Sequence, residues 1–173
     1  MPSKSKRVLI ECSGNKRAYF EEKVFGEHWE NGAMSEGVWK GVPLKTLLEL
    51  TGIKTGVAEV LFSGRDSGIK NRQYIPYERS LPIAKALHPE VMIAYEYNGK
   101  PLSHKQGFPF RLIVPRWYGM ASVKWLNEII LVKDNSPCFL KLVSFPLPSV
   151  LLLFFSSLLL ELPLFSFLVW YGQ

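Results

Sequence analysis

Apolar positions in the first 135 residues fall into short runs interrupted by turn residues, a pattern typical of β-strands. The pattern predicts strands over residues 7–12, 58–62, 91–97, 108–115 and 122–132. We expect the first to be a buried strand that meets a turn at Ser13, Gly14 and Asn15. An Asn-Gly pair follows the third strand and predicts a hairpin. Gly119 is expected to form the turn between the last two strands.

A short helix is predicted over residues 43–50, because Leu44, Leu47 and Leu48 share one helical face and Gly52 supplies a stop. Short helices among strands joined by loops predict an α+β domain with mixed β-sheets.

Two further segments complete this expected architecture. Ser80 is expected to cap a second helix that runs to about Leu87, with Pro82 in its first turn. Residues 63–68, Ser-Gly-Arg-Asp-Ser-Gly, are expected to form a loop at the end of a strand.

The hydropathy pattern changes after residue 135. Lys141 and Glu161 are the only charged residues in 136–173, so the net charge of +6 belongs to residues 1–135. We therefore divide the chain into a domain over 1–135 and a hydrophobic tail over 136–173. Pro146, Pro148 and Pro163 interrupt the tail, whereas a bilayer span needs about 20 apolar residues. A membrane segment within 142–171 and a foreign or frameshifted sequence both stay open.

A basic domain favours anionic ligands. No interleaving of aromatic and basic residues typical of a nucleic-acid module is seen, so we expect no nucleic-acid partner. The two cysteines, Cys12 and Cys138, form neither a zinc motif nor a disulfide framework. The first residues are basic but lack the apolar core of a signal peptide, so the compartment stays unknown.

Six blocks of sequence carry a family resemblance. They are ECSGNKR (11–17), WENGAMSEGVWKGVPL (29–44), FSGRDSG (62–68), SLPIAKALHPEVMIAYEYNGKPL (80–102), GFPFRLIVP (107–115) and GMASVKWLNEI (119–129). In this order and spacing they resemble the molybdopterin domain of the sulfite oxidase family, over about residues 8–132. Several blocks in register are far more specific than any one of them.

The resemblance implies a molybdenum atom bound by the dithiolene of one molybdopterin and by the thiolate of Cys12. A soft thiolate suits a redox metal, and the neighbouring Lys16 and Arg17 favour the ionised sulfur. The alternative is that Cys12 is a small buried hydrophobic residue at a strand end.

The resemblance also implies the substrate-facing residues. Arg17 matches an arginine that faces the oxyanion substrate, and its planar fork of donors suits such an anion. Trp29 matches a tryptophan that lines the same pocket. A solvated surface charge and a core aromatic residue are the respective alternatives, and Trp39 is interpreted as scaffold.

For the rest of the cofactor, Arg111 and Lys124 match residues that bind its terminal phosphate. Ser122 and the amides of the turn at Gly119 can donate hydrogen bonds to it, and Asp66 matches an acceptor for the pterin N–H groups. Taken singly, these residues would more often be exposed charges or turn formers. Two of their neighbours depart from the family pattern or stay unassigned: Gln106 stands where the family typically has a histidine, and His104 has no assigned role.

The activity implied is oxo transfer to sulfite, with the electrons passed to a haem protein such as a cytochrome. Further substrate-site residues and a dimerisation domain implied by the resemblance are not found, so the match is expected to be incomplete at both ends and a homodimer stays open. One alternative is a molybdoenzyme similar to methionine sulfoxide reductases. The other is a non-catalytic, truncated, membrane-attached product.

Overall fold

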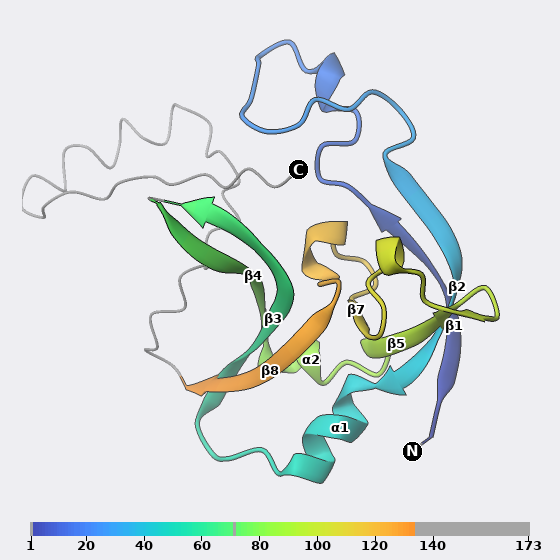
Figure 1. Cartoon of the computed structure of the whole chain (residues 1–173), viewed down its shortest axis with the longest axis vertical. Coiled ribbons are helices and arrows are strands. Elements are labelled where there is room, and N and C mark those ends of the chain that lie inside the picture. The colour runs from blue at the N-terminus through green and yellow to red at the C-terminus, as the bar shows by residue number, and fades with distance from the viewer. Residues whose placement is uncertain (1, 71, 134–173) are drawn as a thin grey trace, which may run out of the picture.

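The computed structural model describes residues 2–70 and 72–133, which form two antiparallel sheets with short helices (Figure 1). The five-stranded sheet has the order β1-β2-β5-β6, and β7 also pairs with β5. Its strands are β1 (Lys4–Glu11), β2 (Met34–Pro43), β5 (Met92–Tyr97), β6 (Lys100–Pro101) and β7 (Arg111–Ile113). The three-stranded sheet has the order β4-β3-β8, from β3 (Val57–Lys70), β4 (Gln73–Pro82) and β8 (Leu126–Lys133). The expected α+β class is confirmed, and each strand pair in the described residues is antiparallel.

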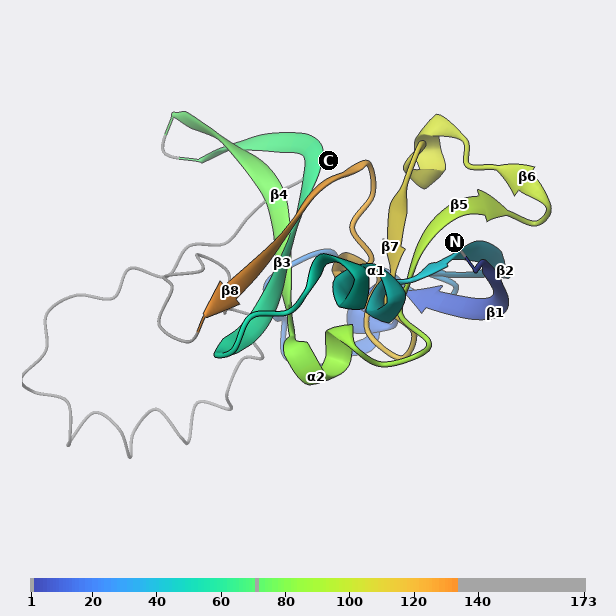
Figure 2. The same ribbon diagram turned by 90° about the horizontal axis from the view of Figure 1, so that it is seen from below.

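Short helices connect the strands, and α1 lies between the two sheets in Figure 2. They are α1 (Leu44–Thr51), α2 (Ile83–Ala86), η1 (Arg17–Tyr19), η2 (His104–Gln106) and η3 (Gly119–Ala121), the last three being 3-10 turns. The helix expected over 43–50 is confirmed as α1, which buries Leu44 and Leu48. It ends at Gly52, whose positive φ of 77° suits a residue without a side chain.

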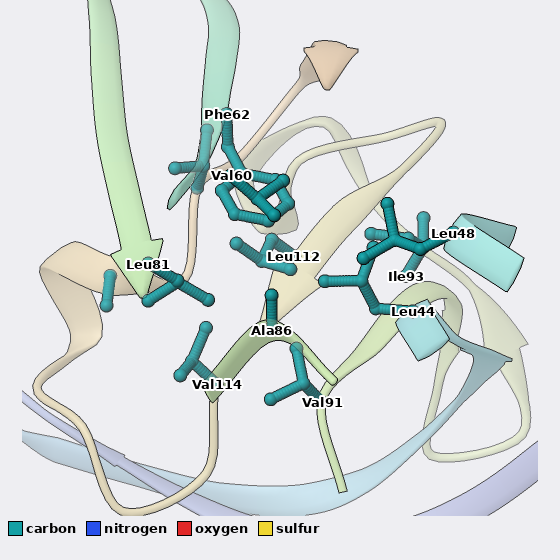
Figure 3. Close-up of a cluster of buried hydrophobic side chains, with 12 residues drawn as sticks. Leu44, Leu48, Val60, Phe62, Leu81, Ala86, Val91, Ile93, Leu112 and Val114 are labelled. Carbon is teal, nitrogen blue, oxygen red and sulfur yellow. The ribbon is translucent and has the colours of Figure 1, made fainter. Parts of the chain in front are cut away.

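A main core joins the two sheets and both α-helices (Figure 3). Its fully buried members include Val60 and Phe62 from β3, Leu81 from β4 and Leu112 from β7. A second core lies on the other face of the five-stranded sheet, because side chains alternate along a strand. It consists of Val8, Trp39, Met92, Ala94, Leu102 and Ile113. The interpretation of Trp39 as scaffold is thereby confirmed.

Three sequence-based expectations about elements are wrong in detail. The expected loop over 63–68 belongs to β3, which continues to Lys70 with an irregular register between Ser63 and Ser67. Its pairing with β4 on one side overrides the loop-like composition. Ser80 lies inside β4, and α2 begins after Pro82 without a side-chain cap. Finally, β1 is an edge strand that buries only Val8.

The hairpin expected at Asn98-Gly99 is confirmed, with positive φ angles of 49° and 76° between β5 and β6. The last two predicted strands also exist, as β7 and β8, although they belong to different sheets. The tail over 136–173 lies outside the described residues. Within the described part, no helix has the length and apolar character needed to cross a membrane.

The main core predicts a sharp contrast between two leucines of α1. Leu48 is 3% exposed, whereas Leu50 is 66% exposed. Replacing Leu48 with alanine leaves a cavity and should lower the free energy of unfolding by about 2–5 kcal/mol. Leu50→Ala is the matched control and should change it by about 0.5 kcal/mol or less. Urea unfolding followed by circular dichroism measures both, and equal midpoints for the two variants would contradict the packing described.

Candidate functional site

A cavity of about 370 Å³, wide open to solvent, lies where β1 ends and β2 begins. Its walls come from these two strands, from the start of β7 and from η3. The lining residues are Ile10, Cys12, Ala33, Met34, Ser35, Arg111, Gly119 and Met120. The fold therefore places the Cys12 sulfur and the Arg111 guanidinium, far apart in sequence, around one space.

Cys12 follows β1 directly and is exposed, which excludes the alternative of a buried hydrophobic residue. Its Sγ accepts a hydrogen bond from the Gly14 backbone N–H at 3.4 Å. A side chain at position 14 would meet the Glu27 carbonyl oxygen at 2.5 Å, so this turn requires glycine. The sulfur is thus held at the cavity wall by a turn that is itself packed against the segment around Glu27.

Arg111 is half-buried at the start of β7. Its Nε and Nη1 groups donate to the carbonyls of Ser122 at 3.3 Å and Gln106 at 3.4 Å, and its guanidinium carbon lies 5.1 Å from the centre of the Trp39 ring. Within residues 2–70 and 72–133 it makes no ion pair with a carboxylate. Burial lowers the pKa of Arg111 to about 10, so the group remains charged at neutral pH.

Lys124 provides a second cation in the same region. Its ammonium donates to the Lys105 carbonyl at 3.3 Å and lies 4.6 Å from the centre of the Trp125 ring. Burial lowers the pKa of Lys124, and the positive charge of Arg111 lowers it further. Lys124 is not among the residues that line the cavity. It lies near Arg111 because the two side chains bond to the consecutive carbonyls of Lys105 and Gln106.

Asp66 lies on β3, within the irregular stretch. Its Oδ1 atom is buried, and within the described residues no donor bonds to it. Burial raises the pKa of the Asp66 carboxyl, while its own backbone N–H, Lys124 and Arg79 act in the opposite direction. A buried acceptor without a donor is costly, so this oxygen is available to a ligand that carries N–H groups.

Ser122 and Gln106 have structural roles in the site region. The buried Ser122 hydroxyl accepts from the Val114 N–H at 3.1 Å, which leaves its own hydrogen as a donor. The Gln106 side-chain oxygen accepts from the Ser103 N–H at 2.9 Å and caps η2. The ring of His104 packs 5.5 Å from that of Trp125.

Arg17 and Trp29 lie on the segment between β1 and β2 and are not among the residues that line the cavity. The Arg17 guanidinium donates to the carbonyls of Ser13 at 3.0 Å, Phe25 at 3.2 Å and Glu27 at 3.3 Å. Trp29 is 51% exposed, and its ring approaches Gly14. Both residues therefore contact the cysteine turn or the loop beside it.

Two residues near Asp66, Tyr77 and Arg79, were not predicted from the sequence. The Tyr77 hydroxyl donates to the carbonyl of Met120, a cavity residue, at 2.8 Å, and the Arg79 guanidinium lies 4.5 Å from the Tyr77 ring centre. Arg79 pairs across the sheet with the buried Phe62. The pattern that could have indicated Arg79 is the alternation along β4, which places Tyr77, Arg79 and Leu81 on one face of the strand, the face of the core.

Comparison with known proteins identifies the class of this domain. The model of the oxidoreductase molybdopterin binding domain matches residues 1–140, and the chain belongs to this family. The chain is 37% identical to the mitochondrial sulfite oxidase of Drosophila melanogaster, over 79% of its length and 24% of the relative. It is also 37% identical to inducible nitrate reductase [NADH] 2 of Glycine max, over 78% of its length and 16% of the relative.

A solved structure supports the same fold. The sulfane dehydrogenase SoxCD from Paracoccus pantotrophus superimposes with a TM-score of 0.65 and 27% sequence identity, covering 79% of this chain and 34% of that one. The suspected family and the sulfite-oxidase-like fold are confirmed. The chain spans about a quarter of the fly sulfite oxidase that it matches.

Family membership implies a molybdenum–molybdopterin cofactor. The residues present fit such a group on three separate counts. An exposed thiol lines the cavity. Within the part of the chain that the structure describes, the half-buried Arg111 beside it has no ion-pair partner and the buried Asp66 oxygen has no donor. Sulfur, phosphate and pterin N–H groups would each find a complementary partner.

The unpaired charge of Arg111 predicts stabilisation by phosphate-type anions. Inorganic pyrophosphate should raise the melting temperature of the cofactor-free protein above that in chloride of equal ionic strength. A ligand at about 100 times its Kd stabilises by about 2.7 kcal/mol. The shift should disappear in Arg111→Gln and persist in Arg7→Gln, whose side chain is 69% exposed. Differential scanning fluorimetry measures it, and an equal shift in both variants would count against an anion at Arg111.

Asp66 predicts a stability that depends on pH. Because its pKa in the folded protein lies above the ordinary 3.8, the folded state binds more protons than the unfolded state just above that pH. The stability contribution of Asp66 therefore falls as pH rises through this interval, and the cost persists at neutral pH. Asp66→Asn should be more stable than wild type at neutral pH and lack this decline.

Urea midpoints of cofactor-free protein from acidic to neutral pH test the Asp66 prediction. Glu128→Gln is the control, because Glu128 is an exposed carboxyl on the neighbouring strand β8. An Asp66→Asn variant that is less stable than wild type at neutral pH would contradict the buried, donor-free geometry.

Proposed function

We propose that this domain binds molybdopterin with the Cys12 sulfur as the protein ligand of molybdenum, and that it functions as an oxidoreductase of the sulfite oxidase type. The observation that carries the proposal is the cavity shared by Cys12 and Arg111, an arginine without an ion-pair partner in residues 2–70 and 72–133. Either residue alone would be ambiguous, whereas a thiol and a cation around one space match the two ends of a metal-bearing, phosphorylated cofactor.

In this proposal each remaining site residue meets one part of the cofactor. Arg111 and Lys124 bind its phosphate, and the Ser122 hydroxyl donates a further hydrogen bond. Asp66 accepts from the pterin N–H groups through the oxygen for which the described residues supply no donor. Charge-assisted bonds of this kind are about twice as strong as neutral ones, so each hydrogen bond to the phosphate from Arg111 or Lys124 would be stronger than a neutral one.

The proposed substrate is sulfite. When bound, molybdenum supplies oxygen-atom transfer coupled to a two-electron change. The protein contributes position and charge: Arg17 has five N–H donors, and its bonds to three carbonyls leave Nε–H and one Nη2–H for an oxyanion. Trp29 borders this position beside the cysteine turn. Conversion of sulfite and water to sulfate releases two electrons and two protons, which a haem protein would accept one electron at a time.

Nitrate is a second candidate substrate, because the identity to the soybean nitrate reductase equals that to the fly sulfite oxidase. In that case the chain would accept electrons and reduce the oxyanion. Reduction of sulfoxides, as in methionine sulfoxide reductases, is the third chemistry to be compared. Parallel assays of sulfite-dependent cytochrome reduction and of nitrate- or sulfoxide-dependent dye oxidation separate these reactions.

A metal analysis tests the proposed ligand directly. Protein purified from cells that make molybdopterin should contain close to stoichiometric molybdenum, and Cys12→Ser should lose most of it, because a hydroxyl replaces the soft thiolate. Cys138→Ser is the matched control and should retain the metal. Inductively coupled plasma mass spectrometry gives the ratio. Equal and negligible molybdenum in all three proteins would support a non-catalytic product instead.

A further inference from the structure

The turn after β1 has a hydrogen-bonded frame that depends on one side chain. The Asn15 backbone N–H donates to the Cys12 carbonyl at 3.0 Å. The Asn15 carboxamide then bonds in two directions. Its Nδ2 donates to Glu11 Oε1 at 2.8 Å, and its Oδ1 accepts the Ala33 N–H at 3.0 Å. One side chain therefore ties the end of β1 to the segment that leads into β2.

Cys12 belongs to the same hydrogen-bonded frame through its backbone. The Cys12 N–H donates to the Ala33 carbonyl at 2.9 Å, so Ala33 bonds to Cys12 through its oxygen and to Asn15 through its nitrogen. Ala33 also lines the cavity. Within the turn, the Gly14 N–H is directed at Cys12 Sγ. The position of the sulfur and its hydrogen bond thus depend on the same closed turn.

We propose that Asn15 is a positioning residue that holds the Cys12 sulfur at the cavity and keeps the Gly14 N–H on it. The proposal rests on the proposed function, in which this sulfur binds molybdenum. Asn15 does not line the cavity; it acts through the turn. An N–H donated to a metal-bound sulfur withdraws electron density from it, and such bonds influence the properties of the metal.

Asparagine is required here because its amide offers a donor and an acceptor at once. Aspartate keeps the acceptor for the Ala33 N–H but places a second carboxylate next to Glu11, which opens the turn by repulsion. Alanine removes both bonds. Both substitutions should therefore weaken the turn, aspartate by charge repulsion and alanine by loss of two hydrogen bonds. Neither changes a residue that lines the cavity.

Asn98 provides a matched control in the same sheet. Its Oδ1 accepts the Val38 N–H of β2 at 2.8 Å, just as Asn15 Oδ1 accepts the Ala33 N–H. It lies in the hairpin between β5 and β6 and is not a cavity residue. Because Asn98 has a positive φ of 49°, alanine there adds backbone strain and should destabilise the fold at least as much as Asn15→Ala.

The experiment compares wild type, Asn15→Ala, Asn15→Asp and Asn98→Ala, isolated after expression in cells that make molybdopterin. Molybdenum affinity should fall by about 10-fold in both Asn15 variants, the lower end for loss of a residue that orients a ligand. The sulfur-to-molybdenum charge-transfer band of the residual holoprotein should move to longer wavelength. Asn98→Ala should keep the metal and the band despite a lower melting temperature.

Wild-type affinity and an unshifted band in the Asn15 variants would overturn the proposal. So would loss of metal in Asn98→Ala, since that assigns the effect to general destabilisation. If the wild-type protein itself binds no molybdenum, the proposed function fails. The positioning role of Asn15 is then tested on the cofactor-free protein by the reactivity of Cys12. In a Cys138→Ser background, alkylation of Cys12 by iodoacetamide should be several-fold faster with Asn15→Ala than without it, and equal rates would overturn the role of Asn15.

Discussion

The site depends on the way β7 passes between two cores. Leu112 and Val114 belong to the main core and Ile113 to the second core, with each of the three 2% exposed or less. Alternation along the strand then places Arg111 on the face of Ile113, against the ring of Trp39. A shift of β7 by one residue would exchange the two apolar faces, so packing fixes the direction of the guanidinium. Arg111 therefore stays in the cavity wall, because β7 cannot rotate about its axis without exposing residues of both cores.

Local signals predicted those elements in which periodicity and end signals agree. The leucines of α1 repeat on one face and Gly52 ends the helix, and the Asn-Gly pair forms its hairpin. The prediction failed for β3, where Gly64 and Asp66 look like loop residues. There β4 pairs with Ser63, Ser67 and Gly68, and β8 pairs with β3 only as far as Gly64. A single sequence does not reveal these partners. Tertiary pairing decided the structure against local composition.

The candidate site was predictable only in part, and for a related reason. The family resemblance named Cys12 and Arg111, but spacing along the chain gives no indication that they share a cavity; the strand order β1-β2-β5 with β7 on β5 brings them together. Arg79 and Tyr77 were missed because an inward-facing arginine is recognised only once the strand and its partner are known. The frame made by Asn15 likewise becomes visible only with the contact to Ala33.

The polar groups of the site also indicate what kind of ligand suits it. Among the described residues, the buried Asp66 oxygen has no donor and Arg111 has no ion-pair partner. Although Asp66 and Lys124 influence each other's charge, no ion pair joins them within the described residues. An ion pair between Asp66 and Lys124 would satisfy both charges within the protein, and neither group would then be free to bind a ligand. Because the geometry keeps opposite charges apart, a simple anion satisfies only one of the two demands. A ligand with N–H donors at one point and a phosphate at another satisfies both, which is the polarity of a phosphorylated pterin.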